Sequence, residues 1–244
     1  MAATPDPPQL QLLPLDVEVG RVLAVAAHPD DLEYGAAAAI AVWTEAGSEV
    51  VYLVATRGEA GIDGMPPELA GPVREAEQRA GAGVVGVEVV EFLDHRDGLI
   101  QPGLRLRRDI AAAIRRHRPD TLLIVNHRET WAPGRLNTAD HRVVGEAALD
   151  AVSDAGNRWI FADLRLPPHK VRQALVAASP LATHALDVTA TVDRAVASLA
   201  EHRAYLDGLG DHRMSDPEFL RMFFEAAGER FGGLPAVAFE LFEF

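Results

Sequence analysis

Cysteine is absent from the 244-residue sequence. Disulfide frameworks, zinc fingers and thiolate nucleophiles are therefore excluded, and any bound metal has to be held by His and carboxylate side chains. Nine His residues are available for that task. Hydrophobic residues make up 48% of the chain and charged residues 24%, an ordinary globular balance that excludes a wholly disordered chain.

An excess of positive charge is also missing, since 23 Lys and Arg face 36 Asp and Glu, for a formal net charge of −13. Nucleic acid and anionic lipid are not expected as main partners, because phosphate binding requires a basic surface, although a local basic pocket stays open. The longest apolar run, 35–43, is about half of the ~20 residues that span a bilayer. The first 20 residues contain no Lys or Arg, which a secretory signal requires. We expect a cytoplasmic protein without a membrane partner, and whether it forms a homo-oligomer is left open.

No internal repeat, low-complexity tract or linker is long enough to divide the chain. Four prolines among the first 20 residues favour an extended Pro-rich N-terminal arm. We therefore predict an arm over 1–20 followed by one domain over 21–244.

Short apolar runs alternate with helix-like segments through the first two thirds of the chain. Buried strands are predicted at 21–27, 49–55, 88–93 and 121–126, and helices at 35–46, 72–83, 104–118 and 141–155. This alternation predicts right-handed βαβ crossovers. The expected fold is α/β, a Rossmann-like three-layer arrangement with a mostly parallel sheet in a single domain.

The alternation becomes less regular after residue 155. Further strands are predicted at 170–178 and 185–188, and further helices at 191–209 and 217–231. Residues 236–244 alternate between apolar and polar side chains, which predicts a final edge strand.

Polar clusters follow four of the predicted strands. Ligands of open parallel sheets gather outside the carboxyl ends of the strands, so these clusters are expected to share one rim. A G-x-G-x-x-G turn is missing after the first strand, and G-x-x-x-x-G-K-[ST] occurs nowhere. Their absence disfavours a nucleotide-binding protein on this scaffold.

The sharpest of these signals is His28-Pro29-Asp30-Asp31, directly after the first strand. Together with His141 at the start of a later helix, His28 and Asp31 would form a two-His, one-carboxylate set. Catalytic zinc sites have this composition and keep a further position open for water. Asp30, beside such a metal, could act as general base toward the water. The alternative is that His28 caps the strand while the acids cap the next helix, and spacing alone leaves both open.

A family resemblance lies in the order of four motifs: AHPDDLEYG after an apolar strand, then ATRGEAG, VREAE, and ADHR opening a helix. Over residues 21–155 the chain resembles the PIG-L/LmbE family of zinc-dependent N-deacetylases. The stretch THALDVT…AVASLAEHRAYL is similar to actinobacterial members, so the resemblance extends over nearly the whole chain.

This resemblance implies a Zn²⁺ cofactor, or another divalent metal, held by His28, Asp31 and His141. It implies that Asp30 is the catalytic base. It also implies a hydrolase that removes an acetyl or acyl group from the nitrogen of an N-acetyl amino sugar, such as an N-acetylglucosamine derivative, or of a glycoconjugate.

One departure from the family pattern concerns proton transfer. Many members have H-P-D-H where this chain has Thr138-Ala139-Asp140-His141, so Thr138 replaces the histidine credited with stabilising the oxyanion and protonating the amine. Threonine cannot shuttle a proton near neutral pH. His127 and His184 are candidate replacements, with an ordinary hydrogen-bonded or surface histidine as the alternative for each. Asp30 could otherwise transfer both protons.

Five further residues each allow two interpretations. Asp140 either orients a histidine ligand or caps its helix. The resemblance implies that Arg57, Arg74 and Asp97 line the sugar pocket; ion pairs with nearby Glu residues are the alternative for the arginines, and a turn role for Asp97. Trp131 is either a wall of the cleft or part of the core.

Two other functions compete with a sugar deacetylase. An amidase acting on a non-sugar or thiol-conjugate amide would use identical metal chemistry, and only pocket residues outside the motifs separate the two. A non-catalytic sugar-binding relative is the other. The intact set of ligands and base disfavours it, because a site without turnover has no physical reason to keep its base.

Overall fold

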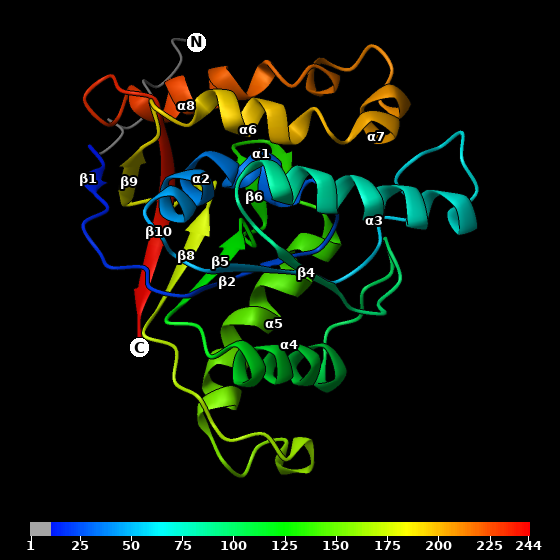
Figure 1. The fold of residues 1–244 in the computed structure, drawn as a ribbon, viewed down its shortest axis with the longest axis vertical. Coiled ribbons are helices and arrows are strands. Elements are labelled where there is room, and N and C mark those ends of the chain that lie inside the picture. Colours follow the sequence, from blue (N-terminus) through cyan, green and yellow to red (C-terminus); the bar gives the residue numbers. More distant parts are fainter. Residues whose placement is uncertain (1–10) are drawn as a thin grey trace, which may run out of the picture.

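A computed structural model describes residues 11–244, and the strands of this part of the chain form a large sheet and a separate small hairpin (Figure 1). The strands are β1 (Leu13–Pro14), β2 (Val22–Ala26), β3 (Val50–Val54), β4 (Val89–Phe92), β5 (Thr121–Val125), β6 (Thr130–Ala132), β7 (Arg135–Leu136), β8 (Gln173–Ala177), β9 (His184–Asp187) and β10 (Ala236–Glu243). The eight-stranded sheet has the order β1-β9-β10-β8-β5-β2-β3-β4, and β6 pairs with β7.

The middle of the sheet is parallel. Strand β2 pairs in parallel with β3 and β5, β3 with β4, and β5 with β8. Every residue of β2, β3, β5 and β8 is buried. Apolar runs without alternation are typical of strands covered on both faces, and this explains why they were visible in the sequence. The predicted α/β fold with a mostly parallel sheet is confirmed.

Helices cover both faces of the sheet. They are α1 (Asp31–Gly35), α2 (Ala37–Glu45), α3 (Pro67–Val84), α4 (Leu104–His117), α5 (Ala139–Gly156), α6 (Val192–Leu199), α7 (Arg203–Gly208) and α8 (Phe219–Gly228), with short 3₁₀ turns η1 (Ala162–Leu164) and η2 (Arg213–Ser215). Helices α4 and α5 lie on one side of the sheet and the others on the opposite side (Figure 1). Two main hydrophobic clusters result, and β2 contributes Ala24 to one and Leu23 and Val25 to the other.

Three predicted helices differ from those observed. The helix expected at 72–83 begins at Pro67, so Pro72 lies inside it. Pro67 occupies the first helical turn, where its missing N–H costs nothing, and the prediction chose the wrong one of two prolines. The helix expected at 35–46 begins at Ala37 as α2, and a separate short helix that was not predicted, α1, precedes it, with Ala36 (φ −148°) between the two. The helix expected at 191–209 divides into α6 and α7.

The prediction of an edge strand at 236–244 was wrong. Strand β10 lies between β8 and β9 and runs antiparallel to both. Phe239 of β10 is fully buried, with its ring centroid 5.8 Å from that of Trp43. An alternating pattern reports that the two faces of a strand differ, but it does not report which strands flank it. In the described residues the edges are β1 and β4.

Residues 11–20 of the predicted arm pack on the sheet. Leu13 and Pro14 pair in parallel with β9, and Leu12, Leu15 and Val19 are buried. Residues 1–10 lie outside the described part of the chain. The division into an arm and a domain at residue 20 stays a prediction.

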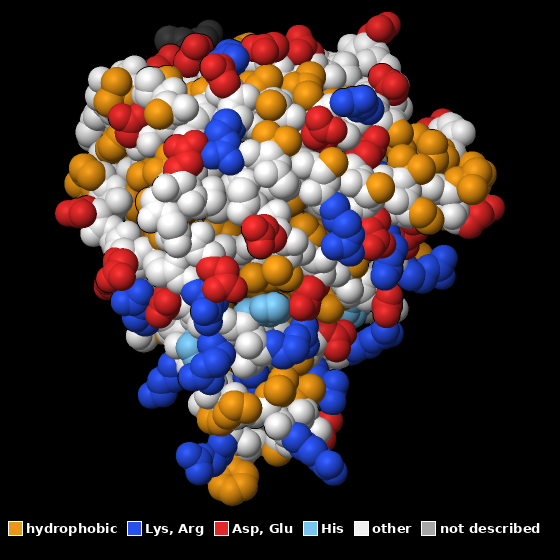
Figure 2. Space-filling model, in the orientation of Figure 1, with side chains coloured by type: hydrophobic (Ala, Val, Ile, Leu, Met, Phe, Trp, Pro, Cys, Tyr) orange, Lys and Arg blue, Asp and Glu red, His pale blue; other side chains and the backbone are white. Residues whose placement is uncertain are grey.

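Charged side chains are unevenly distributed over the surface. On the face shown in Figure 2, Lys and Arg gather mainly in the lower part, around α4 and the loop after α5, and acidic side chains dominate the upper part. Positive charge is thus local on an acidic chain. Within residues 11–244, no helix has the length and apolar character needed to cross a membrane.

Candidate active site

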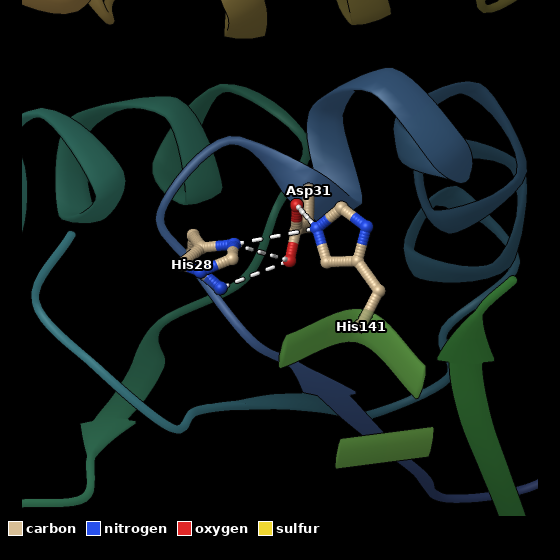
Figure 3. Close-up of side chains that lie close together, drawn as sticks. All are labelled: His28, Asp31 and His141. Carbon is tan, nitrogen blue, oxygen red and sulfur yellow. Dashed lines mark hydrogen bonds and ion pairs between the residues drawn. The ribbon is translucent and has the colours of Figure 1, made fainter. Parts of the chain in front are cut away.

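Three of the predicted site residues meet at the carboxyl ends of β2 and β5. His28 lies in the loop after β2, Asp31 is the first residue of α1, and His141 lies in the first turn of α5. Their side chains point toward one another although His141 is 110 residues from Asp31 (Figure 3). The sheet topology brings them together, because parallel strands end at a common rim.

The ligand atoms of these three residues converge. His141 Nε2 lies 3.0 Å from Asp31 Oδ1 and 3.3 Å from His28 Nδ1 (Figure 3). One ligand atom from each residue falls within a group whose members all lie within 4.8 Å of one another. Two imidazole nitrogens and a carboxylate oxygen at this separation are a donor set that suits a divalent transition metal. The residues present therefore fit the metal that the sequence predicts.

Neighbouring groups hold each ligand in place. Asp31 Oδ2 accepts the backbone N–H groups of Ala27 and His28, at 3.0 and 2.9 Å. His141 Nδ1 lies 2.9 Å from Oδ1 of Asn137, an acceptor that fixes this nitrogen as the N–H donor and leaves Nε2 free to bind a metal. Asn137 was not identified from the sequence, where it is an unremarked residue four positions before His141.

Two carboxylates hold the other nitrogen of His28. His28 Nε2 lies 3.1 Å from Asp97 Oδ1 and 3.2 Å from Asp140 Oδ2. Asp140 is buried and also accepts the backbone N–H of Gly98 at 2.8 Å. The side-chain cap of α5 is Thr138, which accepts the N–H of His141 at 3.4 Å. The geometry thus supports the interpretation of Asp140 as a residue that orients a histidine.

The titration of the cluster reflects these contacts. Burial lowers the pKa of His28, but the carboxylates of Asp140, Asp31 and Asp97 outweigh burial and raise it well above its usual range. Burial raises the pKa of Asp31, but the imidazole of His141 outweighs it, so that this pKa lies well below its usual range. The cluster therefore favours bound positive charge.

Asp30 has a strained backbone and a buried carboxyl group. Its φ of 92° lies in the left-handed region that non-glycine residues rarely adopt, and such strain concentrates at functional sites. Its N–H donates to Oε1 of Gln78 at 3.0 Å, and its Oδ1 accepts from Arg74 at 3.1 Å. Burial raises the pKa of Asp30 to about 6, against the opposing charge of Arg74.

Arg74 is buried beneath Asp30. Its guanidinium donates to the carbonyl oxygens of Pro29 at 2.6 Å and Gly58 at 3.0 Å, and lies 4.2 Å from the ring centroid of Tyr205. The expected ion pair exists, but its partner is Asp30 and not a glutamate. Arg74 also lines the cavity described below.

Three fully buried polar side chains, Glu33, Gln78 and His202, lie behind Asp30. Gln78 Nε2 donates to Oε1 of Glu33 at 2.8 Å, and His202 Nε2 lies 3.6 Å from Oε2 of Glu33. Burial lowers the pKa of His202, but the Glu33 carboxylate outweighs it and raises this pKa. The sequence analysis missed all three residues. The position of Glu33 close to the apolar stretch 35–43 was a sign in the sequence that this charged residue is buried. No local pattern marks Gln78 or His202.

The site opens into a cavity of about 650 Å³. Its lining includes the three ligand residues, Asp30, Arg74, Asp97, Thr138 and Trp131. Trp131 on β6 places its ring edge-on to His141, with the centroids 5.6 Å apart and the planes at 86°. Trp131 is therefore a cavity wall, as one of its two interpretations required.

Four predicted site residues do not line this cavity: Asp140, whose contacts with His28 are given above, and Arg57, His127 and His184. Arg57 pairs with Glu75 and Asp94, at 3.1 and 2.9 Å, outside the described lining. His127 is buried under α5, and burial, followed by the charge of Arg128, lowers its pKa. His184 lies on β9, where its Nδ1 is 2.8 Å from the hydroxyl of Thr183. Neither histidine lines the cavity beside Thr138.

Comparison with known proteins agrees with this geometry. A family model described as "PIG-L: GlcNAc-PI de-N-acetylase" matches residues 23–152, more than half of the chain. The chain is similar to the diacetylchitobiose deacetylase of Thermococcus kodakarensis, with 35% identity over 142 residues, 57% of this chain and 51% of that protein. It is also similar to the 1D-myo-inositol 2-acetamido-2-deoxy-alpha-D-glucopyranoside deacetylase of Kineococcus radiotolerans, with 44% identity over 93 residues, 37% of this chain and 26% of that protein. The chain spans about half or less of the length of these curated relatives.

A solved structure shows the same fold over a longer stretch. The chain is similar to N,N'-diacetylchitobiose deacetylase from Pyrococcus horikoshii in complex with its inhibitor MPG, with a TM-score of 0.83. The superposition covers 93% of this chain and 85% of that one, at 22% identity. At this identity the likeness establishes the fold, and the chemistry has to be argued from the site.

Proposed function

Because this chain belongs to the PIG-L family of de-N-acetylases, we propose that it is a metal-dependent hydrolase of N-acylated amino sugars or glycoconjugates. The observation that supports this most directly is the convergence of His28, Asp31 and His141 at a cavity that Asp30 also lines. A metal site, an adjacent base and space for a ligand are the parts that metal-assisted amide hydrolysis needs.

Zinc is the metal that we propose for this site. His28 Nδ1, His141 Nε2 and one Asp31 oxygen would hold it, since the second nitrogen of each histidine already faces an acceptor. A divalent metal bound here would polarise the amide carbonyl and lower the pKa of a bound water. Nitrogen and oxygen ligands do not select zinc by affinity alone, so iron or another divalent ion is the alternative.

Asp30 would act as the base. Its carboxylate accepts the proton of the attacking water, and Arg74 and Gln78 hold the side chain and backbone in position while it does so. The same carboxyl group would then pass the proton to the leaving amine nitrogen. Neither His127 nor His184 lines the described cavity, which favours this single-residue route over a histidine acid.

For the substrate we propose an N-acetyl or N-acyl amino sugar. The relatives' names refer to diacetylchitobiose and to an inositol 2-acetamido-2-deoxy-glucopyranoside. Trp131 offers an aromatic surface for a sugar ring, and Asp97 faces the cavity beside the ligand residues. An amidase acting on a non-sugar amide and a non-catalytic sugar-binding protein are the alternatives. A cytoplasmic location also stays a prediction.

Acetate release tests the proposal. The full chain loaded with Zn²⁺ is incubated with a panel of N-acetylated sugars, including N-acetylglucosamine and diacetylchitobiose, and acetate and free amine are quantified. We expect release from at least one compound, and loss of release after chelation. When a ligand histidine such as His141 is replaced and assayed in the same way, His184→Ala is the matched control, since His184 lies outside the cavity. Metal-loaded protein that releases acetate from no sugar but does so from a non-sugar amide would favour the amidase.

A further inference from the structure

The cavity extends well beyond the metal-ligand residues. Strands β5, β8 and β10 follow β2 in the sheet, and the cavity lining continues along them to α8. We use "apolar end" for the part that this lining forms away from the ligands: Val125, Phe223, Phe224, Ala236 and Val237. The ligands and Asp30 thus lie at one end of a cavity whose other end is hydrophobic.

Small residues keep this end open. Gly35, Ala178, Ala227, Ala236 and Ala238 all line the cavity. A Cβ at Gly35 would lie 2.9 Å from a methyl group of Val125, so even one added carbon crowds this wall. Ala178 has φ 55°, a left-handed conformation that strains an alanine. Larger side chains at these positions would fill the space. Because the residues there are small, the space stays open for a ligand.

An acetyl group would reach only the part of the cavity beside the ligand residues and would leave the apolar end to water. The cavity measures about 650 Å³, and a water molecule occupies about 30 Å³ in the liquid. The methyl of an acetyl group is of similar size to a water molecule. Phe224, Ala236 and Val237 are buried apolar walls, and an apolar group that replaces water against them gains the hydrophobic free energy of the covered area.

The polar atoms near the apolar end are already used within the protein. The Ser179 hydroxyl donates to Glu240 at 2.8 Å, and the Tyr34 hydroxyl donates to the carbonyl oxygen of Met214 at 2.7 Å. Arg135 also lines the cavity, but it is exposed on the hairpin that carries Trp131. Sugar hydroxyls would lose hydrogen bonds to water at the apolar end without replacing them, which is unfavourable.

The geometry of the substrate amide then indicates which part of the substrate lies at each end of the cavity. The carbonyl carbon has to lie beside the ligand residues and Asp30, and its two substituents leave it in different directions. Asp97 and Arg74, which come from the segments after β4 and β3, make the end beside the ligands charged, so a hydroxyl-bearing amine is less unfavourable there than against the apolar walls. The acyl substituent is then directed toward β8, β10 and α8.

Resting on the proposed function, we propose that the apolar end binds the acyl chain of the substrate, so that the protein acts on amino sugars N-acylated with chains of about six to eight carbons in preference to acetyl. Of the five residues of the apolar end, only Val125 falls within residues 23–152 that the family model matches. The preference is therefore a property of this chain's C-terminal part.

An acyl-length series tests the preference. The Zn²⁺-loaded full chain is assayed on glucosamine N-acylated with acetyl, butanoyl, hexanoyl and octanoyl groups. A buried methylene favours binding enough to raise kcat/KM about fourfold, so hexanoyl, with four more methylenes, should exceed acetyl about 250-fold. A kcat/KM that is flat or falls from acetyl to hexanoyl would overturn the inference and leave the proposed function intact.

A binding experiment covers the case in which no amide is hydrolysed. That result would count against the proposed function, and calorimetry with acetate and octanoate would still decide the present inference. We expect the Zn²⁺-loaded chain to bind octanoate with a Kd at least about 30-fold lower than acetate. Equal affinities would contradict an acyl-binding apolar end.

Two substitutions on α8 test whether the acyl-length preference arises at the apolar end. Ala227→Leu adds volume inside the cavity and should lower the hexanoyl-to-acetyl ratio of kcat/KM at least about tenfold. Ala226→Leu is the matched control, since Ala226 is exposed on the same helix and outside the lining, and should keep the parent ratio. Should Ala227→Leu not fold, Phe223→Ser removes an apolar wall at a residue that is 46% exposed and should also lower the ratio. An unchanged ratio in the folded variant would show that the chain binds elsewhere.

An alkyl glycoside distinguishes the other orientation. If the apolar end bound the aglycone, octyl N-acetylglucosaminide would exceed N-acetylglucosamine in kcat/KM, and the acyl series would show no trend. That pair of results would overturn the assignment of the acyl chain. The opposite pair would support it.

Discussion

At the scale of the residue, the site depends on hydrogen-bond acceptors that stand behind its reactive groups. Each histidine ligand has one nitrogen facing an oxygen: His141 faces Asn137, and His28 faces Asp97 and Asp140. Such outer partners fix the ring orientation and raise the basicity of the nitrogen that binds metal. Asp30, the proposed base, is held in the same manner by Arg74.

Replacement of His141 by alanine should abolish stoichiometric metal binding. His141 supplies one of only two imidazole donors in the ligand group, and the remaining His28 and Asp31 make an incomplete site. Elemental analysis of the purified variant measures this, with His184→Ala as the control that should keep one metal per chain. A His141→Ala protein with full metal content would refute the assignment of this ligand.

Replacement of Asp30 by asparagine should keep the metal and lower kcat by about 10²- to 10⁴-fold, the usual cost of losing a general base. Asparagine tolerates positive φ and matches aspartate in size, so the fold should be retained. The amide nitrogen cannot accept the proton of water. Steady-state kinetics and metal analysis on one preparation test both parts, and a near-normal kcat would show that Asp30 is structural.

Replacement of Thr138 by histidine should raise kcat and add a limb to the pH–rate profile. Thr138 lines the cavity beside His141, and an imidazole there titrates near neutrality and can protonate the leaving amine. Loss of the threonine cap of α5 should lower the free energy of unfolding by about 1 kcal/mol. If Thr138→His, His127→Ala and His184→Ala all leave kcat and its pH dependence unchanged, no histidine acid operates and Asp30 carries both steps; a severe loss in His127→Ala or His184→Ala would instead identify that histidine as the acid.

At the scale of the element, buried polar side chains join the helices behind Asp30. Glu33 lies on α1, Gln78 on α3, and His202 directly before α7. Their contacts tie the segment that carries Asp30 and Asp31 to two helices of the same layer. The position of α1, and with it that of the site, therefore depends on groups outside the cavity.

The stabilising effect of His202 should depend on pH. Its pKa in the folded chain is raised by Glu33, against burial, so the folded state binds the proton more tightly than the unfolded state does. This stabilisation is complete below the ordinary histidine pKa of about 6.5 and is lost as pH rises through the raised value. Urea unfolding of the parent and His202→Gln should therefore show a larger difference at about pH 6 than at about pH 9. A difference that grows with pH would contradict the Glu33–His202 pair.

Sequence patterns predicted the parallel strands and the grouping of His28, Asp31 and His141. They did not predict the buried polar side chains behind this site, Glu33, Gln78 and His202. Continuous apolar runs identify strands buried on both faces, and strand ends in such a sheet share a rim, so His28 and His141 could be placed together. Arg57 was assigned to the cavity from motif position, yet its side chain turns to Glu75 and Asp94. The Glu33–Gln78 contact joins residues 45 apart, and no local period encodes such a pairing.

At the scale of the whole molecule, one sheet separates two hydrophobic clusters, and each face depends on strands from distant parts of the sequence. Phe239 illustrates this, because it belongs to β10 and packs against Trp43 of α2 in the larger cluster. The C-terminal third therefore shares a core with the family-matched residues 23–152.

Replacement of Phe239 by alanine should lower the free energy of unfolding by about 3–5 kcal/mol, the usual cost of an aromatic ring lost from a packed core. Because the two parts of the chain share this core, unfolding should stay a single transition with an unchanged denaturant slope. Urea titration followed by tryptophan fluorescence and circular dichroism tests this. Two separate transitions would indicate that the C-terminal part unfolds independently.

The interior position of β10 has a consequence for how the protein is made. About 60 residues separate the end of β8 from the start of β10. At about 5–20 residues per second, a ribosome needs about 3–12 s to synthesise them. During that interval one edge of β8 has no partner, while β1 and β9, which pair in this sheet only with each other and with β10, have no link to the parallel strands. An unpaired strand that is apolar except for Gln173 is a template for wrong pairing. The nascent chain is therefore prone to mispairing until residues 236–243 emerge and pair with β8.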